Sequence, residues 1–106
     1  MDDIIRKEYK DFNNKENKKL QIEVYYDLGG YSYLSGTKNP RGYYLSVTPV
    51  LVKEHSVEYS FNDRGYKTLL LEVKRKSKKR ADEAIKLSYE KEQELIDAVL
   101  QRYNIN

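Results

Sequence analysis

The stretch Leu20-Gln21-Ile22-Glu23-Val24-Tyr25-Tyr26-Asp27-Leu28, followed directly by Gly29-Gly30, is the strongest structural signal in this chain of 106 residues. Apolar or aromatic side chains stand at every even-numbered position, and the odd-numbered positions hold Gln, Glu, Tyr and Asp. This period of two is typical of a β-strand with one face in solvent. The glycine pair permits positive φ at both turn positions. It therefore predicts a tight hairpin into a returning strand at residues 31–35.

Further strands are expected after a turn cluster at residues 36–42. Alternating patterns place them at residues 42–52, 57–61 and 66–74, with a turn at 62–65. Pro49 has no N–H to donate, so the first of these strands must lie at a sheet edge there or bend. Alternation, rather than continuous apolar runs, indicates an antiparallel sheet.

Helical spacing predicts a helix on each side of the strands. Ile5, Tyr9 and Phe12 are spaced i, i+4 and i+7, which predicts a short amphipathic helix over residues 3–13. Residues 80–103 lack Gly and Pro and predict a long helix.

The long helix begins after Ser77, a suitable N-cap. Its apolar stripe is interrupted only by Glu92 and runs through Ala81, Ile85, Tyr89, Ile96, Val99 and Tyr103. The whole pattern predicts one α+β domain over residues 1–106. We expect an antiparallel four- to five-stranded β-meander with a short N-terminal helix, and the long C-terminal helix packed on one face.

Composition excludes several kinds of site. The chain has no cysteine and one histidine, His55, which rules out disulfides, thiolate metal sites and any site with two imidazoles. His55 falls in a predicted turn and no GxSxG serine is present, so we place it outside any site. No apolar run is long enough to span a membrane, and the acidic start is no signal peptide. We expect a cytoplasmic protein without cofactor, metal or membrane binding.

Positive charge is concentrated between the last strand and the long helix. Lys74 to Arg80 reads Lys-Arg-Lys-Ser-Lys-Lys-Arg and holds six of the 20 Lys and Arg residues, whereas all 17 Asp and Glu residues lie elsewhere. Such a cluster neutralises phosphates along a nucleic-acid backbone. It also suits an acidic protein surface or a solvated linker. Cations at Lys78 to Arg80 are unfavourable to the helix dipole, and their retention there favours a binding role.

Tyrosine is the second unusual feature, with eleven residues and no tryptophan. The segment 29–44 combines glycines, tyrosines and Arg41. Aromatic rings beside cations stack on bases or anchor a protein partner, and they also pack on neighbouring strands. The segment is not a phosphate loop, because it lacks both the GK[ST] ending and a GxGxxG pattern.

A third pattern is Glu72-Val73-Lys74, nine residues after Asp63. This spacing is that of the PD-(D/E)xK nucleases, in which two carboxylates hold Mg²⁺ and the lysine steadies the attacking water. Asn62 stands where the pattern has proline, and only three residues follow Tyr103, which leaves no parallel strand after the helix. A metal-dependent nuclease-like site is therefore a minor alternative.

The leading hypothesis is a small non-enzymatic binding module for nucleic acid. Its candidate backbone contacts are Lys74, Arg75, Lys76, Lys78, Lys79 and Arg80, with Arg41, Arg64 and Lys67, and its candidate stacking residues are Tyr25, Tyr31 and Tyr44. The alternative is a protein–protein interaction module, such as a small inhibitor or accessory factor of a mobile genetic element. Tyrosines on the same face as Lys74 and Lys76 favour nucleic acid; tyrosines around a separate flat apolar patch favour a protein partner.

Overall fold

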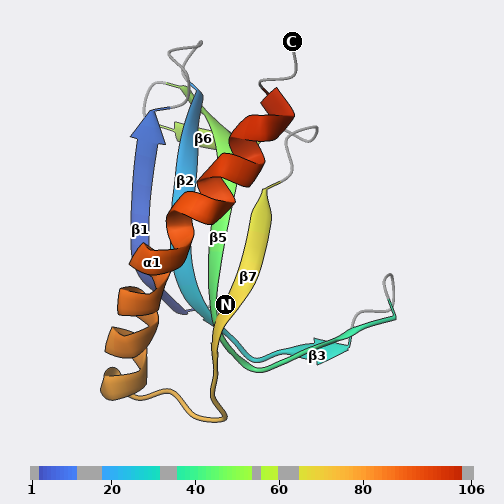
Figure 1. Cartoon of the computed structure of the whole chain (residues 1–106), viewed down its shortest axis with the longest axis vertical. Helices are drawn as coiled ribbons and strands as arrows, with labels where there is room; N and C mark the ends of the chain where they lie inside the picture. The colour runs from blue at the N-terminus through green and yellow to red at the C-terminus, as the bar shows by residue number, and fades with distance from the viewer. Residues whose placement is uncertain (1–2, 12–17, 32–35, 54–55, 60–64, 104–106) are drawn as a thin grey trace.

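The computed structural model describes residues 3–11, 18–31, 36–53, 56–59 and 65–103. Its elements are β1 (Asp3–Asp11), β2 (Lys18–Asp27), β3 (Gly30–Tyr31), β4 (Lys38–Asn39), β5 (Gly42–Lys53), β6 (Ser56–Tyr59), β7 (Tyr66–Glu72) and α1 (Lys78–Tyr103). An antiparallel sheet contains β1, β2, β5, β6 and β7, and α1 crosses one of its faces (Figure 1). The predicted α+β class and antiparallel sheet are confirmed.

The predicted N-terminal helix is wrong, because residues 3–11 form strand β1. β1 pairs with β2, and its register shifts by one residue between Ile4 and Arg6, which is a β-bulge at Ile5. Beyond the bulge, Arg6, Glu8 and Lys10 lie on the side that faces α1. A short isolated helix is marginal in water, so pairing with β2 outweighs the local spacing of three apolar side chains.

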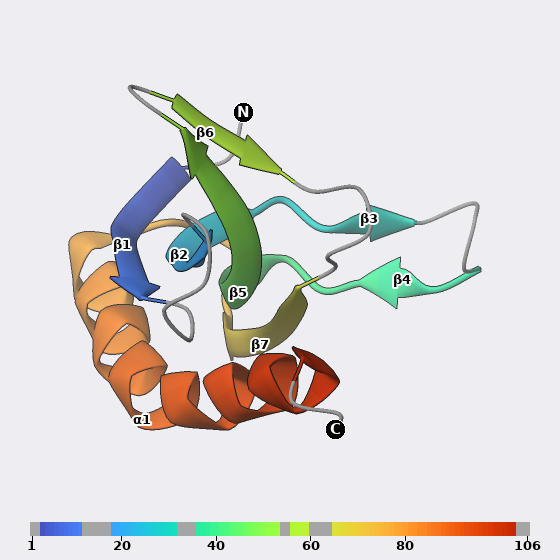
Figure 2. The ribbon, with the colours of Figure 1, turned by 90° about the horizontal axis from the view of Figure 1, so that it is seen from above.

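The predicted meander is also wrong at the glycine pair. β2 pairs with β1 and β5 rather than with the segment that follows it, and Tyr25 lies opposite Tyr44. The chain after Gly29-Gly30 instead forms β3, which pairs with β4 in a separate two-stranded sheet. We call residues 28–31 and 36–41 together the arm, because these residues project away from the main sheet (Figures 1 and 2). Residues 32–35 lie outside the described residues.

β5 is the central strand of the main sheet. Along one side it pairs with β2, and along the other it pairs first with β7 and then with β6. The β7 register ends at Val47 and the β6 register begins at Val50. Pro49 therefore falls in the interval between the two ladders, where no N–H is required of it.

The core lies between the main sheet and α1. The even-numbered side chains of β2 are buried at positions 20, 22, 24 and 26, as their alternation predicts, and Leu28 leaves the sheet with the arm. The main buried residues are Leu20, Ile22, Val24 and Tyr26 from β2, Tyr43, Leu45 and Val47 from β5, and Ala84, Leu95, Ile96 and Val99 from α1. Burial of this apolar surface holds the two layers together.

The start of α1 confirms Ser77 as its cap. The Ser77 hydroxyl accepts a hydrogen bond from the Arg80 backbone N–H at 3.2 Å, and the Ser77 carbonyl accepts one from Ala81 at 2.9 Å. The helix begins at Lys78, two residues before the predicted start. Among the described residues, no helix is both long enough and apolar enough to cross a bilayer.

Candidate functional site

Arg41 ties the arm to the end of β7. Its Nε donates a hydrogen bond to the Leu28 carbonyl at 3.1 Å, and a terminal guanidinium nitrogen donates to the Lys74 carbonyl at 3.4 Å. The Arg41 carbonyl accepts a hydrogen bond from the Val73 N–H at 3.1 Å. A guanidinium carries five N–H donors, so Arg41 retains donors for an outside ligand. These bonds set the position of Lys74 relative to the arm.

A concave surface of about 490 Å³ lies at this junction, and we call it the junction hollow. It is lined by Leu28, Gly30, Lys38, Asn39, Pro40, Arg41, Glu72 and Lys74. Three cations and one carboxylate line it, so its net charge is positive. A hollow of one dominant charge concentrates ions of the opposite charge. The junction hollow therefore favours an anionic ligand.

The six basic residues from Lys74 to Arg80 are all exposed. Lys76 forms an ion pair with Asp3 of β1, and the hydrogen bond from this pair raises the pKa of Lys76. Arg80 forms an ion pair with Glu83 at 2.8 Å. The other four, Lys74, Arg75, Lys78 and Lys79, have no carboxylate partner within the described part of the chain. The first turn of α1 also has no acidic residue, so positive charge remains uncompensated there.

Tyr25 and Tyr44 lie on the sheet face away from α1. Their ring centroids are 5.9 Å apart in a stacked arrangement, and the Lys67 ammonium lies 5.5 Å from the Tyr44 ring centroid. Only 5% of Tyr44 is exposed, and its hydroxyl donates a hydrogen bond to the Pro40 carbonyl at 2.6 Å. The interpretation of Tyr44 as an exposed stacking residue is therefore wrong. Its ring packs inside the protein, as cross-strand aromatic pairs commonly do.

The basic run does not share that face. The Lys76 ammonium lies 5.6 Å from the ring of Tyr26, which belongs to the core beneath α1. The Tyr26 hydroxyl lies 3.3 Å from the carbonyls of Val73 and Lys74, which holds the start of the run on this side. Lys67, one of the residues predicted to contact a nucleic-acid backbone, lies beside the Tyr25–Tyr44 pair and not beside the basic run. Tyr31, in the arm, is 62% exposed.

Sequence reasoning missed a buried ion network between β1 and α1. Arg6 and Glu92 are 7% and 6% exposed, and the Arg6 guanidinium donates hydrogen bonds to Glu92 at 2.5 Å and to the Ser88 hydroxyl at 2.9 Å. The Lys10 ammonium donates to the second Glu92 carboxylate oxygen at 2.6 Å. Glu8 pairs with Arg6 from the same strand. The signal in the sequence was Glu92 itself, which interrupts an otherwise apolar stripe.

Each charged group of the network has a partner of opposite charge, and an aromatic ring covers the Arg6 guanidinium. Burial by itself raises the pKa of Glu92, but the hydrogen bonds and positive charges of Lys10 and Arg6 together hold it below its ordinary value. The exposed Tyr89 ring covers the guanidinium, with its centroid 3.7 Å from Arg6 Cζ. No buried side-chain polar atom of the described residues lacks a hydrogen-bond partner. We assign this network to the joining of β1 to α1.

Asp63 and Arg64, two of the proposed residues, lie outside the described residues, as does His55, which the sequence places outside any site. Glu72 and Lys74 of the nuclease-like pattern are both exposed, and Glu72 lines the junction hollow. The described residues contain no group of three or more His, Cys, Asp and Glu that could hold a metal ion. The nuclease-like arrangement with Asp63 stays a prediction.

Comparison with known protein families, with curated proteins and with solved structures finds no match for this chain. The functional proposal therefore rests on the chain's own geometry and charge.

Proposed function

We propose that this protein is a small non-enzymatic module that binds the phosphate backbone of a nucleic acid at the junction hollow and the start of α1. One observation carries the proposal. The Arg41 hydrogen bonds bring the arm and the end of β7 together, so that Lys38, Arg41 and Lys74 line a single hollow. Lysine and arginine side chains arranged in this way neutralise successive phosphates.

The charges beyond the hollow support the same proposal. Lys74, Arg75, Lys78 and Lys79 lack carboxylate partners within the described chain, and two of them begin α1. The N-terminus of a helix attracts anions through its unpaired N–H groups and its dipole. A bound phosphate would therefore relieve the repulsion among the cations and complement the dipole. Backbone phosphates carry the negative charge that such a surface attracts.

The position of the tyrosines limits the kind of recognition. Tyr25 and Tyr44 stack on each other, away from the basic run, so base stacking on this pair does not form part of the proposed interface. Tyr31, on the described part of the arm, is exposed. Contacts to phosphates set position without reading sequence. We therefore expect weak dependence on base sequence and strong dependence on salt.

Fluorescence anisotropy of labelled single- and double-stranded DNA and RNA, measured as a salt titration, tests this proposal. We expect K74A/K78A/K79A to weaken binding and to reduce the slope of log affinity against log salt by about 2 to 3. The matched control K7A/K86A/K91A removes the same charge from three exposed lysines elsewhere and is expected to retain the wild-type slope. Equal loss in both variants would show attraction to net charge rather than to this surface.

A protein partner with an acidic surface is the second candidate. The observation that favours it is the exposure of Leu28 (65%) and Tyr31 (62%) on the arm, beside the cations of the junction hollow. Aromatic and apolar anchors next to charges are typical of protein interfaces. Absence of nucleic-acid binding at about 50 mM salt, where charge contacts are strong, would reject the first proposal and favour this one.

A further inference from the structure

The outer strands β1 and β7 of the main sheet differ in how their open edges are protected. β1 carries mostly charged side chains, which discourage pairing with another strand. β7 pairs with β5 along one side, and no other strand of the described chain pairs along its second side. At its centre lies the half-buried run Leu69-Leu70-Leu71. An edge strand with an apolar centre and open N–H and C=O groups is a template for another strand.

A bulge in β7 places Lys67 and Glu72 on one face. Lys67 lies opposite Ser46 of β5 and Glu72 lies opposite Gly42, so their partners are an even number of residues apart. In a regular strand, two residues with an odd separation point to opposite faces. The extra residue at Leu70 restores them to the same face, the one away from α1. Both side chains are exposed.

We propose that the β7 edge pairs antiparallel with the same edge of a second copy of this chain. One register opposes Lys67 to Glu72 of the second copy, and the two-fold axis then forms this ion pair twice. The edge is thus complementary to itself. A symmetric two-fold interface requires such self-complementarity, whereas the binding of an unrelated peptide does not require it. Because both copies carry the same bulge, the paired segments match in length.

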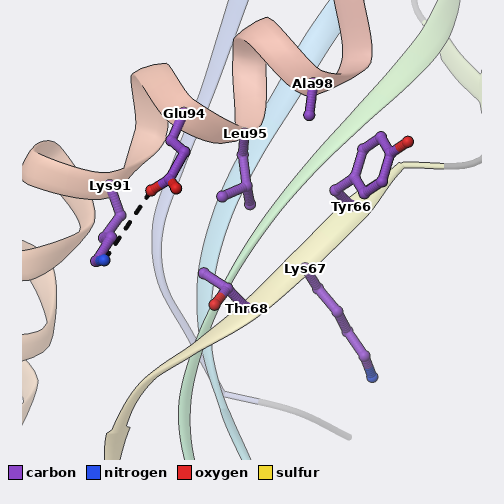
Figure 3. A pocket seen from close by; sticks show the side chains of 7 residues that line it. All are labelled: Tyr66, Lys67, Thr68, Lys91, Glu94, Leu95 and Ala98. Carbon is purple, nitrogen blue, oxygen red and sulfur yellow. Dashed lines mark ion pairs between the residues drawn. The ribbon is translucent and has the colours of Figure 1, made fainter. Parts of the chain in front are cut away.

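A groove beside β7 fits the same register. It has a volume of about 240 Å³ between β7 and α1 and is lined by Tyr66, Lys67, Thr68, Lys91, Glu94, Leu95 and Ala98. Tyr66 and Thr68 face Leu95 and Ala98 across it, whereas Lys67 points away (Figure 3). In the proposed register Thr68 opposes Leu71, and Tyr66 opposes Val73, of the second copy. Leu71 and Val73 of the second copy lie on the α1 side of the sheet and would bury apolar surface at the groove.

Sedimentation velocity over a concentration series, with the charge-reversal variants K67E and E72K, tests the proposal. We expect the wild type to dimerise. Each single variant is expected to dissociate at least about tenfold more readily, because two symmetric attractions become two repulsions between opposed side chains. An equimolar mixture of the two variants opposes unlike charges at both positions, so the dimer should return. The double variant K67E/E72K should dimerise for the same reason.

The control K86E makes the same charge change on an exposed face of α1 and should remain a dimer. Circular dichroism confirms the fold of each variant, and the mixture shows whether a monomeric variant retains a competent edge. A monomeric wild type at every concentration, dimers of K67E alone, or a mixture that stays monomeric would each overturn the proposal. None of these outcomes depends on nucleic-acid binding.

Discussion

At the scale of single residues, the buried pair of Arg6 and Glu92 carries the largest expected effect on stability. Arg6→Ala leaves Glu92 buried with Lys10 as its remaining cation, so we expect a loss of about 3 kcal/mol in the free energy of unfolding. The double variant R6M/E92L replaces both charges by apolar side chains and should lose much less. Urea unfolding at neutral pH measures both. Equal losses in the single and double variants would contradict an unpaired charge as the cause. As a control, Lys7→Ala, on the opposite face of β1, should lower the free energy of unfolding by less than about 0.5 kcal/mol.

The same carboxylate gives the protein a pH dependence of known sign. The folded state holds the pKa of Glu92 below its ordinary value, so this stabilisation is complete above the ordinary carboxyl pKa and is lost as the pH falls through the lower folded value. Glu92→Gln removes that titration. We expect urea midpoints of the wild type to fall more steeply than those of E92Q between about pH 6 and pH 3. Parallel curves would assign the acid sensitivity to other carboxylates.

At the scale of elements, the position of the arm depends on Gly29. This residue has φ of 75°, and a side-chain Cβ here would lie 2.5 Å from the Asn39 carbonyl oxygen and 2.9 Å from the Arg41 nitrogen. Gly29→Ala should therefore cost about 1 to 2 kcal/mol for the backbone conformation and a further amount for the clash. It should also increase amide hydrogen exchange at Val73, which donates to the Arg41 carbonyl.

Gly36 provides the matched control for that clash. Its φ of 68° imposes the same conformational cost, but the nearest atom to an added Cβ is the Tyr31 hydroxyl at 3.9 Å. Gly36→Ala should leave the exchange of the Val73 amide unchanged. If both variants behave alike, the close approach at Gly29 does not set the arm's position.

At the scale of the whole molecule, two layers divide the surface into distinct regions. α1 covers one face of the main sheet, and the junction hollow lies where the arm meets the end of β7. The edge of β7 that we propose for self-association faces away from β5. Charge is not spread evenly, because the basic run stands at the start of α1 and the acidic residues lie elsewhere. The hydrogen bond from Arg41 to the Lys74 carbonyl joins the arm to the basic run, although the two residues are 33 positions apart. The fold, and not the order of the chain, brings these two segments together.

Patterns with a single physical cause were readable from the sequence alone. Alternation in residues 20–28 predicted strand β2 and its buried face. The apolar helical stripe, interrupted only by Glu92, together with Ser77 predicted α1 to within two residues of its start. The six adjacent cations identified the exposed basic run without any knowledge of the fold. Each of these signals is local: backbone geometry, capping and hydration act between neighbours in the chain.

The remaining features were decided by tertiary structure. Ile5 and Tyr9 have helical spacing, yet residues 3–11 are a strand because β2 supplies hydrogen bonds and Glu92 supplies a counter-charge for Arg6. Gly29-Gly30 permits a hairpin, yet β2 pairs with β5 along its whole length and the glycines start the arm instead. Tyr44 is buried because pairing of β5 with β2 places it against Tyr25. Arg41 joins two segments that are distant in sequence, because the fold brings the carbonyls of Leu28 and Lys74 within reach of its guanidinium. Contacts between residues far apart in sequence outweigh local preference when they bury surface and satisfy charge together.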